Sequence, residues 1–182
     1  MDPAFSKRNP QACKTAIPIT GVWRDRVFLF EDFAERAMGN HEIAQKVVDF
    51  RLRYEFNKMF VDTITAQATV AEEIQHKLTN SGLPFVDVED IPSHKQSKIA
   101  RIYAMQSIFK TRRFLIRHDH VNFKREYSGF PRSAQRDLLD ALAFQRKEWE
   151  KIMQYGATST ASEGRQDHIQ QDIDRIRRNM AA

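Results

Sequence analysis

Few residues in this sequence stand at the spacings that catalysis or metal binding requires. The segment His118-Asp119-His120 comes nearest to a metal site. On a helix, two histidines two positions apart point in different directions, and no third ligand follows at a short spacing. In a loop they would be able to chelate a metal, but solvated or anion-facing histidines are the simpler interpretation. The adjacent carboxylates Glu72-Glu73 and Glu89-Asp90 diverge from one another, so we interpret both pairs as solvated.

Motifs for nucleophilic catalysis and for phosphate binding are not found in the sequence. No serine is flanked by the glycines of a nucleophile elbow, and there is no glycine-rich phosphate loop. Cys13 is the single cysteine, and no histidine adjoins it to activate a thiolate. We therefore predict that the protein is not an enzyme and that it uses neither a cofactor nor a metal.

The segment 93–125 carries the clearest chemical signal. It holds nine of the chain's 29 Lys and Arg residues but only one of its 24 Asp and Glu residues. Such a concentration of positive charge favours phosphate, an anionic membrane surface or an acidic protein as the partner. The candidate partner-binding or anion-binding residues are Lys98, Arg101, Lys110, Arg112, Arg113, Arg117, Lys124 and Arg125.

Two interpretations of this segment remain open. Its Phe, Ile and Leu residues recur at helical spacing, which is typical of a core, so the basic face would dock on other protein subunits or on anionic lipid headgroups. We favour this interpretation. In the alternative, the protein binds nucleic acid or associates with the ribosome: the cations contact phosphates, and Tyr103 or Phe123 stacks on bases.

Composition sets the broad class of the protein. Its 182 residues are 41% hydrophobic, with a formal net charge of +5, which suits one globular domain with flanking segments. A single cysteine predicts an intracellular reducing compartment. No apolar run is long enough to span a membrane. The basic N-terminal residues faintly resemble an organellar presequence, so we expect a mitochondrial or a cytoplasmic location.

The hydrophobic periodicity predicts an all-α protein, an irregular bundle of four to five helices with one long helix. We expect an extended arm over 1–22, a helical domain over 23–156, a flexible linker over 157–164 and a protruding C-terminal helix over 165–182. The helices of the domain are predicted over 24–38, 41–79, 93–118 and 133–155. The apolar segment 83–92 would be able to form a short strand, but no second strand is evident to pair with it.

The C-terminal segment has the pattern of a partner-binding helix. Its apolar residues follow a four-three-four spacing on an otherwise polar helix, which is typical of a seam that packs on another helix. The residues of this seam are Ile169, Ile173, Ile176 and Met180.

Residues 91–151 resemble the small, matrix-side helical subunit of the mitochondrial cytochrome bc1 complex (complex III subunit 7). The resemblance lies in an acidic loop ending in an apolar-Pro pair, a helix with Arg-Ile, a loop aromatic and a final charged helix. The corresponding segments here are Val88-Glu89-Asp90-Ile91-Pro92, Arg101-Ile102, Phe123, and Leu138-Leu139 leading to Arg146-Lys147-Glu148-Trp149. The resemblance implies a non-catalytic accessory subunit of a larger assembly, such as a mitochondrial respiratory complex, that docks through the basic helix, the arm and the tail helix.

Overall fold

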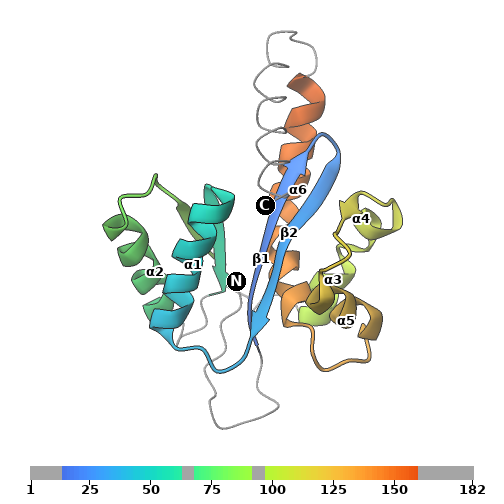
Figure 1. The fold of residues 1–182 in the computed structure, drawn as a ribbon. Coiled ribbons are helices and arrows are strands. Elements are labelled where there is room, and N and C mark those ends of the chain that lie inside the picture. The colour runs from blue at the N-terminus through green and yellow to red at the C-terminus, as the bar shows by residue number, and fades with distance from the viewer. Residues whose placement is uncertain (1–13, 63–67, 92–96, 160–182) are drawn as a thin grey trace.

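The computed structural model describes residues 14–62, 68–91 and 97–159, which form a mixed α/β fold (Figure 1). The all-α prediction is therefore wrong. Strands occur where helices or an extended arm were expected, and they form one three-stranded and one two-stranded sheet.

A β-hairpin runs through the middle of the molecule (Figure 1). β1 (Thr15–Trp23) pairs antiparallel with β2 (Arg26–Glu35), with a bulge between Ile19 and Thr20. Most of the predicted arm after residue 14 is thus β1, and the predicted helix 24–38 is largely β2. The β-branched and aromatic run at the start of β2 fits a strand better than a helix. The turn contains no glycine; instead Arg24 adopts the positive φ, 56°, that tight hairpin turns demand.

The predicted long helix 41–79 is three separate elements. α1 (Asn40–Tyr54) ends where Glu55 turns to a left-handed φ of 52°, and β3 (Lys58–Asp62) and α2 (Ala68–Asn80) follow. β3 pairs in parallel with β4 (Asp87–Ile91), so α2 lies in the crossover between two parallel strands. The segment 83–92 therefore does contain a strand, β4. Its partner is β3, which lies within the predicted helix 41–79.

Both faces of the hairpin are covered by apolar residues. Ile17 and Ile19 belong to one core, which they share with α1, β3 and α2. Ala16, Val27 and Leu29 belong to a second core, which includes residues of the helices that follow β4. Because side chains alternate along a strand, one hairpin supplies both cores. The position of β1 and β2 between α1 on one side and α6 on the other is visible in Figure 1.

The prediction of a helix over 133–155 is confirmed, with shifted ends. α6 (Asp137–Ser159) replaces the predicted helix 133–155, and its residues Leu138, Leu139, Leu142 and Trp149 are buried as expected. It continues past the predicted end into residues 157–159 of the predicted linker. The rest of that linker and the predicted tail helix, including Ile169, Ile173, Ile176 and Met180, lie outside the described residues.

Candidate nucleic-acid interface

The basic segment is not the single helix that we predicted over 93–118. α3 (Lys98–Tyr103) begins at Ser97, whose Oγ accepts a hydrogen bond from the backbone N–H of Ala100 at 3.2 Å. α4 (Gln106–Lys110) follows, and the chain then turns at Arg112, which has a φ of 56°. β5 (Phe114–Leu115) joins β2 in parallel, and α5 (Val121–Gly129) completes the segment.

Two of the candidate cations are bound within the fold. Lys98 Nζ lies 2.8 Å from Oδ1 of Asp137, at the first turn of α6. Arg101 donates two hydrogen bonds to Asp140, from Nε at 2.9 Å and from Nη2 at 2.8 Å. Both carboxylates are almost fully buried. Since these pairs join α3 to α6, Lys98 and Arg101 hold the fold together and do not contribute free charge to a docking face.

A third carboxyl group, from α5, meets the same end of α6. Glu126 Oε2 accepts the backbone N–H groups of Leu138 at 2.9 Å and of Leu139 at 3.1 Å. Glu126 therefore caps α6 from a neighbouring helix, where a negative charge also suits the helix dipole. Burial raises the pKa of the Glu126 carboxyl, and nearby Asp137 adds to that increase, whereas the two N–H groups oppose it.

Three further candidates make local contacts. Arg113 Nε donates to the backbone oxygen of Asp25 at 2.6 Å and so ties the end of α4 to the hairpin turn. Arg117 pairs with Asp119 at 3.1 Å, and Lys124 Nζ donates to the backbone oxygen of His118 at 2.6 Å. These side chains remain on the surface, where such pairs are weak and exchange readily with another anion.

The remaining candidates are free. Within the described part of the chain, Lys110, Arg112 and Arg125 are exposed, and their side chains form no hydrogen bond or ion pair. Arg132 shares these properties, but it was missed because it falls beyond the basic segment of the sequence. The sequence feature that could have identified Arg132 is its position next to Pro131 in a loop, where long polar side chains are usually exposed. We refer to Lys110, Arg112, Arg125 and Arg132 as the exposed cations.

An aromatic cluster joins α4 and α5, the helices that carry Lys110 and Arg125. The ring of Phe109 on α4 lies 5.2 Å from that of Tyr127 and 6.1 Å from that of Phe123, both on α5. Phe123 is buried, so it is unable to stack on a base as the nucleic-acid hypothesis proposed. Tyr127 is 49% exposed and Tyr103 is 47% exposed, so both tyrosines present ring surface to solvent.

The histidine motif is split between two environments. His120 is buried: its Nδ1 accepts the backbone N–H of Arg117 at 3.1 Å, and its Nε2 lies 3.4 Å from the backbone oxygen of Phe30. His118 is exposed. Both ring nitrogens of His120 are thus occupied by backbone atoms. Among the described residues, no group of three His, Cys, Asp or Glu side chains is placed to hold a metal ion.

The carboxylate pairs have surface partners. Glu73 pairs with His41 at 3.3 Å, and Glu89 pairs with Lys58 at 3.0 Å. Glu72 is exposed. Cys13 lies outside the described residues.

The sequence matches no protein-family model and no curated protein. Within the described residues, no helix has both the length and the apolar character to cross a membrane. The resemblance to the cytochrome bc1 subunit, the non-enzymatic role and the compartment all stay predictions.

Proposed function

We propose that this protein binds nucleic acid and that the exposed cations contact its phosphates. The observation that carries the proposal is the free positive charge that remains after the buried carboxylates have neutralised Lys98 and Arg101. Lys110 ends α4, which carries Phe109, and Arg125 lies on α5, which carries Phe123 and Tyr127, so the two helices that form the aromatic cluster also carry both cations. Cations beside exposed aromatic rings are typical of surfaces that bind nucleic acid.

The alternative, an accessory subunit, now has less support than it had from the sequence. It rested on an arm, a tail helix and a basic helix that all point outward. Residues 15–22 of the arm form β1 instead, inside the fold, and the tail lies outside the described residues. The basic helix is divided, and its candidate cations Lys98 and Arg101 are bound internally. Docking on other protein subunits or on lipid headgroups stays a prediction for the part of the segment that is still free.

The proposed contacts set the expected salt dependence. Four cations that each neutralise one phosphate give a slope of log affinity against log salt of about −3 to −4 on duplex DNA, and a shallower slope on single strands. Exposed tyrosines would add stacking only on unpaired bases. A comparison of duplex with single-stranded ligands of equal length therefore separates phosphate contact from base stacking.

The test is fluorescence anisotropy with labelled DNA of about twenty nucleotides, at salt concentrations from about 50 mM upward. The variant is Arg112→Glu with Arg125→Glu. We expect it to lose at least tenfold in affinity and to show a shallower salt slope, because two phosphate contacts become repulsive.

The matched control is Lys147→Glu with Lys151→Glu. Both residues are exposed on α6, so the net charge changes equally away from the aromatic cluster. Equal weakening by the two double variants would show that overall charge, not this surface, attracts the DNA. Absence of binding at low salt would exclude the proposal. Binding to anionic vesicles in that case would favour the lipid headgroup alternative.

A further inference from the structure

The turn of the central hairpin carries positive charge outside the basic segment. It includes Arg24, Asp25 and Arg26, and all three residues are exposed. Within the described part of the chain, the side chains of Arg24 and Arg26 form no hydrogen bond or ion pair. Asp25, the acid between them, is engaged by Arg113, whose Nε lies 3.6 Å from Asp25 Oδ2 and donates to the backbone oxygen of Asp25 at 2.6 Å. The turn therefore retains two uncompensated positive charges.

The hairpin turn lies beside the turn that carries Arg112. The backbone N–H of Val27, just after the hairpin turn, donates to the backbone oxygen of Arg113 at 2.8 Å. The Arg113 side chain returns the contact at Asp25. Arg112 directly precedes Arg113 in the sequence, so its exposed charge adjoins the charges of the hairpin turn.

Each of these neighbouring turns holds an arginine in a conformation that arginine seldom adopts. Arg24 and Arg112 both have a φ of 56°, and they are two of the four non-glycine residues with a positive φ in 14–62, 68–91 and 97–159. Tight turns usually place glycine or asparagine at such positions. Backbone strain that persists in a fold is concentrated at functional sites. Since turn geometry does not favour arginine at either position, the strain points to a use for its charge.

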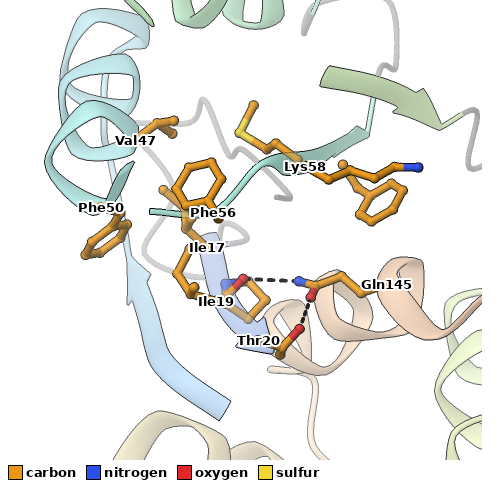
Figure 2. A pocket seen from close by; sticks show the side chains of 11 residues that line it. Ile17, Ile19, Thr20, Val47, Phe50, Phe56, Lys58 and Gln145 are labelled. Carbon is orange, nitrogen blue, oxygen red and sulfur yellow. Dashed lines mark hydrogen bonds between the residues drawn. The ribbon is translucent and has the colours of Figure 1, made fainter. Parts of the chain in front are cut away.

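Arg24 is also held in place. Its guanidinium carbon lies 4.4 Å from the centroid of the Trp23 ring. A guanidinium over an aromatic ring keeps N–H groups at its edge that are able to bind phosphate. Behind the turn, β1 is anchored on α6, because Gln145 Nε2 donates to the backbone oxygen of Pro18 at 3.1 Å and Gln145 Oε1 accepts from Thr20 Oγ1 at 2.5 Å (Figure 2). A ligand at the turn therefore meets a cation that is already positioned.

We propose that Arg24 and Arg26 form a second contact site for the backbone phosphates of nucleic acid, continuous with the site at Arg112. The inference rests on the proposed function and extends it, because one ligand then contacts both the exposed cations and the hairpin turn. Phosphates repeat along a nucleic-acid strand, so a ligand of this class is able to engage cations on several elements at once.

The salt dependence of binding measures how many phosphates are in contact. Six cations predict a slope of log affinity against log salt of about −5 on duplex DNA, steeper than the slope of about −3 to −4 from the four exposed cations alone. The variant is the full chain with Arg24→Gln and Arg26→Gln. We expect it to lose at least about fivefold in affinity at about 100 mM salt and to return to a slope of about −3 to −4.

Two control variants separate charge at this site from other effects. Lys147→Gln with Lys151→Gln changes the net charge equally on α6, and it should keep the affinity and the slope of the parent. Arg24→Lys with Arg26→Lys keeps both charges in the turn, so its slope should stay near about −5. Urea denaturation of each variant checks that the fold is retained.

Three results would overturn this inference and leave the proposed function intact. They are a parent slope of about −3 to −4, equal weakening by the two glutamine variants, and a slope in the lysine variant as shallow as that of the glutamine variant in the turn. In each case Arg112→Glu with Arg125→Glu should still weaken binding. Absence of DNA binding by the parent would overturn both the proposed function and the second contact site.

Discussion

The two ends of the basic segment are alike in sequence and differ in what their charges do. At α3, Lys98 and Arg101 meet carboxylates that are buried at the start of α6. At α4 and α5, Lys110, Arg112 and Arg125 meet solvent. A lysine or arginine count treats these two groups as one patch, whereas the fold assigns one group to packing and the other to the surface.

The cause of the difference is the location of the acids. Asp137 and Asp140 lie 39 residues from Lys98 and Arg101 respectively, and only the packing of α6 on α3 brings them together. A buried carboxylate requires a partner, because an ion without one is costly in a low-dielectric interior. We infer that stability depends strongly on the α3 cations and weakly on the exposed cations, and that ligand binding has the reverse dependence.

The largest effect on stability is expected from Asp140→Ala. The substitution removes the carboxylate that accepts two hydrogen bonds from Arg101, whose side chain is only 14% exposed. Loss of one partner of a buried pair costs about 3–5 kcal/mol. Urea denaturation followed by circular dichroism measures the free energy of unfolding.

The matched control is Asp119→Ala. Asp119 pairs with Arg117 at the surface, where half of its side chain is exposed, so the expected loss of stability is much smaller than that of Asp140→Ala. Similar losses for the two alanine variants would contradict the distinction between the two ends of the segment. If Asp140→Ala does not fold, Asp140→Asn retains one acceptor oxygen and should still lose more stability than Asp119→Asn.

A smaller effect, which depends on pH, is expected from Glu126. Its pKa is raised in the folded state by burial, so the folded protein holds this proton more tightly than the unfolded chain, whose carboxyl has the usual pKa of 4.5. The stabilisation is complete below that value and is lost as the pH rises through the higher folded pKa. Glu126→Gln keeps an acceptor for the N–H groups of Leu138 and Leu139 but does not titrate.

The measurement is the free energy of unfolding of the parent and of Glu126→Gln between about pH 4 and pH 7.5. We expect the two proteins to agree within about 1 kcal/mol at the acid end, because the variant keeps the same hydrogen bonds. The parent should then fall relative to the variant as the pH increases. A difference that is independent of pH, or that changes in the opposite direction, would refute the assignment of this proton to Glu126.

Local patterns in the sequence were sufficient to predict α6 but not the sheets. The apolar residues of α6 recur at helical spacing without interruption, and one face of that helix is buried. In β2, by contrast, Val27, Phe30 and Phe33 recur every three residues, which is typical of a helix and not of a strand, and the turn before β2 lacks the glycine that marks a hairpin. Gly39 directly follows the predicted helix 24–38, the usual place of a C-terminal glycine, yet it is the N-cap of α1, where Glu42 Oε2 accepts its N–H at 2.6 Å.

The candidate site could be predicted only in part, because its composition depends on contacts between elements that are distant in the sequence. Lys110, Arg112 and Arg125 could be named from the sequence as single residues, since exposure needs no partner, whereas Arg132 was missed because it falls beyond the basic segment. Which cations are neutralised depends on pairs such as Arg101 with Asp140, and such pairs follow from the packing of distant elements. Strands β1 and β3 were beyond prediction from the sequence, because β1 falls in the expected arm and β3 in the expected long helix.

The smallest effect on stability is expected at Arg112, and it separates stability from binding. Arg112 has a φ of 56°, a conformation that costs a non-glycine residue about 1–2 kcal/mol, offset in part by the greater entropy that glycine loses on folding. Arg112→Gly should therefore be more stable than Arg112→Ala by about 0.5–1 kcal/mol. Both variants lack the cation, so both should bind DNA with the same reduced affinity. Urea denaturation measures the stability of the two variants, and fluorescence anisotropy measures their affinity for DNA. If the more stable variant also binds DNA more tightly, Arg112 acts through the fold and not through phosphate contact.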